Sequence, residues 1–344
     1  MRRTARIALA VAGSIVLSTG CASTRGGSAP GWVAGESARY PRETYLTGVG
    51  FGDSRATAED RAYAAISRIF EAEVNQRTHE WERYLQTEAG RETTIRRSVG
   101  IEQLTAVSTK KVVENVRIAE TWKDERSGTD YALAVIDRRQ ASAALRQRIT
   151  SLELDLEELL KQARESQTKL GKVRALHQAV DDVLLRDAYN TQLRVVNPSG
   201  LAPDLLTRLG PIRQELQEFL AKNFRITLEV TGKDADRVRS AVMESLTRQG
   251  LPVSRDQVTD ADVAIKGVVD FMPLDLGQPT KFVRWTARFQ VIDPATGQVI
   301  GSVDREGREG HVTASEAEAR ARRQAQQEVV ADLSSQIAGY IFDK

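Results

Sequence analysis

The first 21 residues constrain this chain more than any other stretch, because they decide where it can fold. They read MRRTARIALAVAGSIVLSTGC, with three arginines near the start and an uncharged, mostly apolar run over residues 7–17. Small residues follow the run, and this order is typical of a secretory signal peptide. The apolar run is shorter than the roughly 20 residues that a membrane-spanning helix needs. We therefore expect residues 1–20 to be a cleaved signal peptide.

Ser18-Thr19-Gly20-Cys21 resembles the bacterial lipobox, which is cut before a cysteine whose sulfur then receives a lipid. The motif prefers Leu three positions before the cysteine, whereas here Leu17 lies four positions before it. The alternative is an ordinary signal peptide followed by an unmodified cysteine. Ala22 follows the cysteine in place of Asp, which by resemblance to lipoproteins of double-membrane bacteria implies the outer membrane. We expect a lipid on Cys21, an outer-membrane anchor and a chain on the periplasmic face.

Composition excludes several classes of function. The chain has 344 residues, of which 49 are basic and 47 acidic, and loss of the three signal-peptide arginines leaves 46 against 47. A nucleic-acid binder would show a strong basic excess. Cys21 is the only cysteine, and the three histidines, His79, His177 and His311, are far apart in sequence. We therefore expect no disulfide, no metal site and no cofactor.

Residues 21–42 have the Gly-, Ser- and Pro-rich composition of a flexible tether. Trp32 and Tyr40 are expected to dock its end onto the first domain. That domain, residues 43–138, opens with a strand in which three glycines share one face; they are Gly48, Gly50 and Gly52. An alanine-rich helix over residues 56–70 follows, and we expect it to pack closely on the glycines.

The same glycines have an alternative interpretation as a phosphate or dinucleotide loop. Gly48-x-Gly50-x-x-Asp53 lacks the third glycine of the dinucleotide motif, and no lysine is placed as in a Walker A loop. We therefore favour a structural role for the glycines.

The segment YLTGVGFGDSRATAEDRAYAAISRIFEAEV, together with the preceding lipobox, resembles the opening of the Lpp-twenty (LPP20) lipoprotein family. The resemblance covers about Trp32 to Gln140. It implies an outer-membrane lipoprotein with an assembly or structural role, and it brings no catalytic residues.

The rest of the first domain is expected to hold a polar stretch over 73–91, a helix over 92–107, and strands around residues 112–122 and 131–136. Residues 139–222 form a helical segment in which apolar positions step by three and four, with an interruption at Gly171. The stripe fits either a hairpin that packs on itself or a dimerising coiled coil. It is shorter than a coiled coil usually needs, which favours the hairpin.

The pattern of residues 223–344 predicts a second α+β domain. Strands alternate from 224 to 230, 263 to 271, 283 to 291 and 299 to 303, and helices are expected over 233–249 and 314–340. FQVIDPATGQVIGS with the last helix resembles envelope domains of the TolB amino-terminal, curli-secretion and synthase-activator type. The fold class is therefore α+β: two small domains joined by a helical hairpin segment.

Binding is the function that these patterns favour. No G-x-S-x-G nucleophile motif occurs, so we expect no catalytic residues and no enzyme activity. Candidate partner-binding residues are Trp81, Tyr84, Trp122, Arg284 and Arg288, although core packing or a solvated strand face explains each of them equally well. We expect a structural, assembly or interaction factor of the cell envelope that contacts envelope proteins. The alternative is a regulator of peptidoglycan synthesis, or a lipoprotein that binds peptidoglycan itself.

Overall fold

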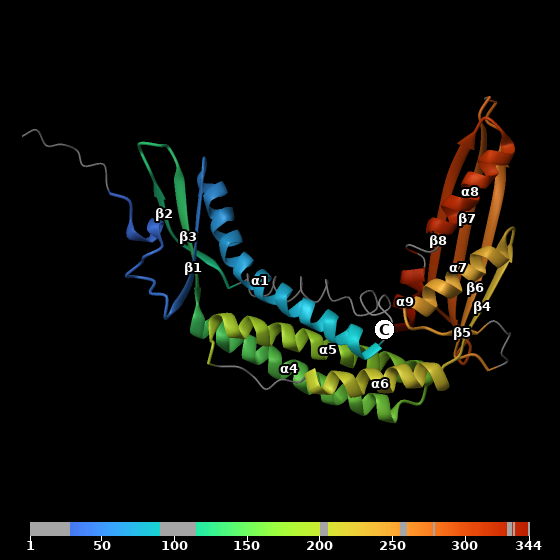
Figure 1. Cartoon of the computed structure of the whole chain (residues 1–344), viewed down its shortest axis with the longest axis horizontal. Helices are drawn as coiled ribbons and strands as arrows, with labels where there is room; N and C mark the ends of the chain where they lie inside the picture. Colours follow the sequence, from blue (N-terminus) through green and yellow to red (C-terminus); the bar gives the residue numbers. More distant parts are fainter. Residues whose placement is uncertain are drawn as a thin grey trace, which may run out of the picture.

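The computed structural model describes residues 28–89, 115–199, 206–254, 260–277, 279–328, 332 and 334–342. Within these ranges the chain forms helices and two separate sheets, so the α+β class is confirmed. Both sheets project from the same side of a layer of helices (Figure 1). We call each sheet, together with the helices that cover it, an arm: the first arm contains the N-terminal sheet and the second arm the C-terminal sheet. The expected signal peptide and Cys21 lie outside the described residues.

The first sheet has three antiparallel strands in the order β1-β3-β2. They are β1 (Tyr45–Gly52), β2 (Arg117–Lys123) and β3 (Asp130–Asp137). The first half of α1 (Arg55–Ala89) covers the face on which the three glycines lie. A Cβ at Gly50 would lie 2.2 Å from both the carbonyl oxygen of Ala58 and the backbone nitrogen of Ala62. The strand and the helix therefore approach to backbone contact.

The helix α1 continues well beyond the end expected at residue 70. The segment read as a polar stretch is helical as far as Ala89, because Val74 and Trp81 are buried against a helix from the middle of the chain. The helix expected over residues 92–107 and the strand start expected near residue 112 lie outside the described residues.

The opposite face of the first sheet is covered by the end of the tether. A short 3₁₀ helix, η1 (Gly31–Ala34), buries Trp32 against Leu133 and Val135 of β3. Tyr40 is buried in the same cluster. The docking expected of Trp32 and Tyr40 is therefore confirmed.

The helical layer consists of α4 (Arg138–Glu165), α5 (Lys169–Val196) and α6 (Leu206–Lys222). The helices α4 and α5 pack along each other as a hairpin, and α5 also contacts α1 and α6. Gly171 does not interrupt the helix as expected. It lies in the first turn of α5, where its N–H donates to the Thr168 hydroxyl at 3.1 Å. The break falls at residues 166–168, because the Thr168 side chain caps a new helix there.

The second sheet has five strands in the order β5-β4-β6-β7-β8. They are β4 (Ile226–Gly232), β5 (Val253–Ser254), β6 (Val263–Leu274), β7 (Lys281–Asp293) and β8 (Gln298–His311). The strand β4 runs parallel to β5 and β6, and the remaining pairs are antiparallel. Residues 293–297 form the expected turn, in which the Asp293 carboxylate accepts from the Ala295 N–H at 2.9 Å.

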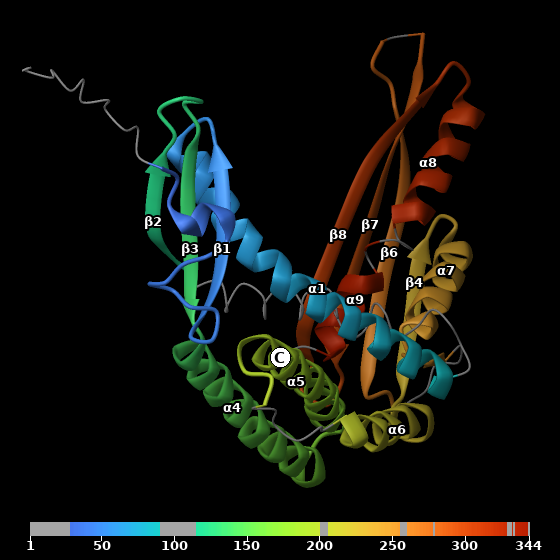
Figure 2. The same ribbon diagram turned by 60° about the vertical axis from the view of Figure 1, so that its left-hand side comes forward.

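One face of this sheet is covered by α7 (Ala235–Arg248), α8 (Ala314–Glu328) and α9 (Ser334–Phe342), as Figure 2 shows. The last two helices occupy the range for which the sequence predicts a single helix. Arg174 of α5 donates to the Tyr340 carbonyl at 2.8 Å, so the end of the chain is fastened to the helical layer. Within the described ranges, none of the helices is both long and apolar enough to cross a bilayer.

Candidate functional site

Three aromatic side chains form a row across the first sheet at the end that points away from the helical layer. Phe51 of β1 and Trp122 of β2 are each in register with Tyr131 of β3. The ring centroids lie 6.0 Å apart for Phe51 and Tyr131 and 5.3 Å apart for Trp122 and Tyr131. Because side chains alternate along a strand, the row lies on the face opposite the three glycines.

The outer end of this aromatic row is open to solvent. Phe51 is 57% exposed, whereas Trp122 and Tyr131 are half-buried. Arg61 of α1 donates to the Phe51 carbonyl at 2.8 Å, and its guanidinium carbon lies 6.0 Å from the Phe51 ring centroid. An exposed phenyl ring held beside a guanidinium suits contact with a surface that is partly apolar and partly polar.

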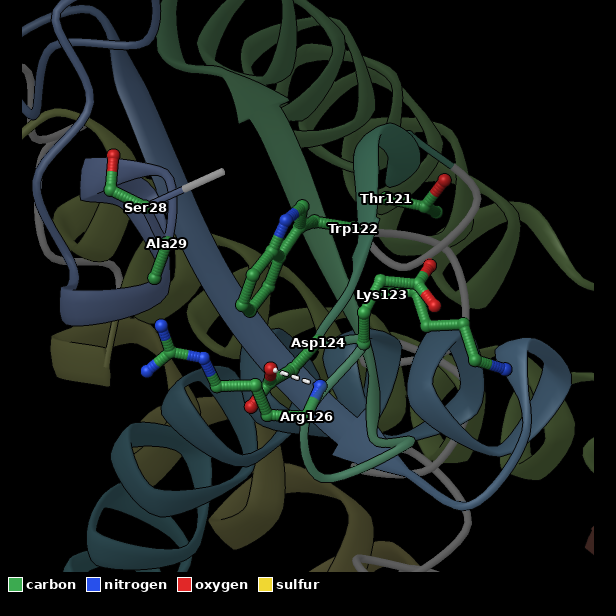
Figure 3. A pocket seen from close by; sticks show the side chains of 8 residues that line it. Ser28, Ala29, Thr121, Trp122, Lys123, Asp124 and Arg126 are labelled. Carbon is green, nitrogen blue, oxygen red and sulfur yellow. Dashed lines mark hydrogen bonds between the residues drawn. The ribbon is translucent and has the colours of Figure 1, made fainter. Parts of the chain in front are cut away.

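An open hollow of about 800 Å³ lies beside Trp122, between the β2–β3 hairpin and the start of the described chain (Figure 3). It is lined by Ser28, Ala29, Thr121, Trp122, Lys123, Asp124, Glu125 and Arg126. In Figure 3 the Trp122 ring stands in the middle of this set and the Arg126 side chain reaches toward Ala29. The hollow therefore combines one aromatic face with charges of both signs.

The hairpin that carries the hollow is held by Asp124. Its carboxylate accepts the Arg126 N–H at 3.0 Å and the Ser127 hydroxyl at 2.8 Å. The Arg126 N–H, followed by the Ser127 hydroxyl, lowers the pKa of Asp124 below its ordinary value. These two hydrogen bonds hold the turn between β2 and β3.

Arg284 and Arg288 lie on the second candidate surface, which is the face of the five-stranded sheet opposite α7, α8 and α9. Both point outward from β7. Arg284 forms an ion pair with Glu306 of β8, and Arg288 is in register with Asp304. The outward positions on the three long strands are Lys266, Val268, Asp270, Met272, Arg284, Thr286, Arg288, Gln290, Ser302, Asp304, Glu306 and Arg308.

The structure does not bring the five predicted partner-binding residues together. Trp81 is only 1% exposed, and its indole N–H donates to Asp187 at 2.9 Å. Its interpretation as a surface anchor is therefore wrong, because the side chain belongs to the core between α1 and α5. Tyr84 lies on α1, but its side chain is outside what the structure describes. Trp122 lies on the first sheet, far from Arg284 and Arg288 on the second.

Sequence reasoning missed Phe51 and Tyr131. Strand alternation does place Phe51 opposite the glycines, but the register that aligns it with Tyr131 and Trp122 depends on how β1 and β3 pair across about eighty to ninety residues. In the part of the chain that the structure describes, no three His, Cys, Asp or Glu side chains are grouped so that they could hold a metal ion.

Residues 30–137 match the model of the LPP20 lipoprotein family, which confirms the resemblance read from the first domain. The match covers about a third of the 344 residues. Among curated proteins none matches the chain. The resemblance of the second α+β domain, residues 223–344, to TolB amino-terminal and related domains stays a prediction.

Three of the solved structures to which the chain is similar are the following. A secreted protein of Helicobacter pylori is 15% identical over 85% of this chain and 97% of its own, with a TM-score of 0.39. A minor lipoprotein of Acinetobacter baumannii is 20% identical over 34% and 91%, with a TM-score of 0.24. A lipoprotein of Neisseria meningitidis is 11% identical over 30% and 96%, with a TM-score of 0.22. These scores support no inference about function.

Proposed function

We propose that this chain is an outer-membrane lipoprotein that faces the periplasm and is held by lipid on Cys21. The signal peptide, the cysteine that follows it and the LPP20 match over residues 30–137 support this proposal. The protein serves as a structural, assembly or interaction factor of the cell envelope, with flagellar or secretion assembly as the leading setting. It works by binding and carries no chemistry of its own.

The observation that carries the binding role is the face of the five-stranded sheet opposite α7, α8 and α9. No element in the described part of the chain packs on this face, which we call the open face. Sheets in globular domains usually bury one face and expose the other to water, so an open face by itself is ordinary. This one differs because Val268 and Met272 are 42% and 62% exposed among the charged side chains. Apolar side chains ringed by charges of both signs fit a folded protein partner better than a nucleic acid or a uniformly charged polymer.

Site-specific photocrosslinking in intact cells tests this role. A photoreactive residue at Arg284, whose side chain is 51% exposed, samples the open face. The matched control is the same residue at Arg320, which is 47% exposed on α8 at the helix-covered side. We expect one defined adduct from position 284 and none of that mass from position 320. Identical adducts from both positions, or none from either, would contradict a binding role for the open face.

The alternative role in peptidoglycan predicts a different result. Purified sacculi would then sediment the full lipoprotein, and the adduct at position 284 would be absent or would contain a peptidoglycan synthase. Sedimentation with sacculi and no protein adduct would replace the assembly role with peptidoglycan binding.

A further inference from the structure

Exposed apolar side chains gather at the free ends of both arms. The first tip comprises residues 51–55 and 122–131, and the second tip comprises residues 272–277, 279–282 and 308–313. Eight large hydrophobic side chains are exposed in the part of the chain that the structure describes, and four of them lie at these tips. They are Phe51 at 57%, Met272 at 62%, Leu276 at 46% and Val312 at 74% exposure.

The two tips lie on the same side of the molecule. The strand β1 and the β2–β3 hairpin run away from the helical layer, and so do the β6–β7 hairpin and the end of β8 (Figures 1 and 2). The helices α1 and α8 start at these tips and return toward the layer. A flat surface laid across both tips would therefore leave the helical layer on the far side.

The lipid anchor would hold the first tip close to the membrane. Ser28 lines the hollow at Trp122, and it follows Cys21 by only seven residues. An extended chain spans at most about 3.6 Å per residue, so Ser28 lies within about 25 Å of the cysteine. The exposed Phe51 and half-buried Trp122 and Tyr131 are then next to the bilayer, where aromatic rings favour the interface.

We propose that the two tips dock on the membrane that holds the lipid, so that the protein stands on it at two points with the helical layer facing away. This proposal rests on the lipid anchor at Cys21 in the proposed function. The open sheet face then stands upright on the bilayer and faces sideways along the membrane surface.

The charges at the tips indicate that apolar insertion drives the contact. The first tip has three basic and four acidic residues, and the second has two of each. An electrostatic membrane contact would need a basic excess. At the second tip the Arg308 guanidinium lies 5.2 Å from the Phe282 ring centroid, which leaves the arginine beside an apolar ring at headgroup depth. Docking should therefore occur on zwitterionic lipid and persist in high salt.

Depth-dependent fluorescence quenching tests the docking. The lipidated full-length protein is placed on zwitterionic phospholipid vesicles that carry a headgroup-attached quencher, and flotation reports anchoring. Because lipid occupies the Cys21 sulfur, a single new cysteine can take a fluorophore: Glu125→Cys at the first tip or Leu276→Cys at the second. The matched control is Leu154→Cys, because Leu154 is 68% exposed on α4 of the helical layer.

The result expected is flotation of all three proteins, with quenching at positions 125 and 276 at least five-fold stronger than at position 154 and unchanged in high salt. Adding Phe51→Asp and Met272→Asp should bring the tip quenching down about five-fold, toward the level at position 154, because each removes a large apolar side chain from the contact. Leu154→Asp should change nothing.

The other outcomes separate the two proposals. Flotation with unquenched tips, quenching at only one tip, or equal quenching at position 154 overturns the two-point docking and leaves the anchor intact. Quenching that needs anionic lipid or vanishes in salt overturns apolar insertion. Failure to float overturns the lipid anchor and the docking together.

Discussion

Arg77 of α1 and Asp187 of α5 form an ion pair whose Nε and Oδ2 atoms lie 2.7 Å apart. The side chains are 20% and 4% exposed, so the pair is largely removed from water. The Trp81 indole N–H donates to the same carboxylate oxygen at 2.9 Å. Burial lowers the pKa of Arg77, but hydrogen bonds to Asp187 and Glu80 outweigh it and raise that pKa above its ordinary value. This cluster fastens the first arm to the helical layer.

Asp187→Ala should therefore loosen the second half of α1. The change leaves the Trp81 N–H without its acceptor and takes the Asp187 carboxylate away from the partly buried Arg77, which costs about 3 kcal/mol. Hydrogen–deuterium exchange over residues 74–89 and α5 should show faster exchange than in the wild type. Asp236→Ala is the control, because that side chain is 88% exposed and its loss costs less than about 0.5 kcal/mol. Unchanged protection in α1 after Asp187→Ala would show that apolar packing alone holds the helix.

The cluster also explains why the sequence does not reveal the length of α1. Residues 73–89 are mostly polar and contain no long apolar stripe, so local pattern predicts an exposed stretch. The helix persists because Val74, Arg77 and Trp81 recur on one side and meet α5, more than one hundred residues later. By contrast, the sequence does predict the glycine-faced strand and β7. In both strands the side chains that share a face recur at every second residue, which is a pattern that local sequence shows.

The sequence predicts only part of the candidate site, for the same reason. The sequence predicts that Trp122 and the two arginines of β7 could contact a partner, and strand alternation places them on exposed or half-exposed faces. The aromatic row needs Phe51, Tyr131 and Trp122 to be in register across three strands. Register depends on pairing between distant segments, which a single sequence does not encode locally.

Gly50→Ala should separate α1 from the first sheet. An added Cβ would lie 2.2 Å from backbone atoms of Ala58 and Ala62, so the helix has to move, at a cost of about 3 kcal/mol. Gly52→Ala is the matched variant, because its Cβ would meet the Thr57 side chain at 2.8 Å and cost about 1 kcal/mol. Urea unfolding followed by circular dichroism compares the two. Equal midpoints for both variants would contradict the close backbone approach at Gly50.

Acid should weaken the contact between α8 and the start of α7. Glu318 accepts from Lys233 and from Arg322, the latter at 2.7 Å. The hydrogen bond from Lys233 is the largest cause that lowers the pKa of Glu318. A lowered folded-state pKa contributes stability above the unfolded-state pKa of about 4.3, and that stability is lost as the pH falls through the folded-state value.

The measurement is thermal unfolding between pH 6 and pH 3 for the wild type and Glu318→Gln. The variant should start less stable at pH 6 and lose less on acidification, so the two curves converge at low pH. Glu244→Gln is the control, because Glu244 is 73% exposed on α7 and meets Arg248 only at 3.7 Å. Parallel curves for the wild type and Glu318→Gln would show that Glu318 does not carry this pH dependence.

Cys21→Ser should release the protein from the membrane fraction. Several acyl chains on one cysteine make a stable anchor, since each buried methylene contributes about 0.8 kcal/mol. The tips expose only a few apolar side chains, so without the lipid their contact is weak and reversible. We expect radiolabelled palmitate to enter the wild type and not the variant, and the variant to appear in the soluble periplasmic fraction. A variant that stays in the membrane pellet without label would mean that the tips or a protein partner hold the chain there.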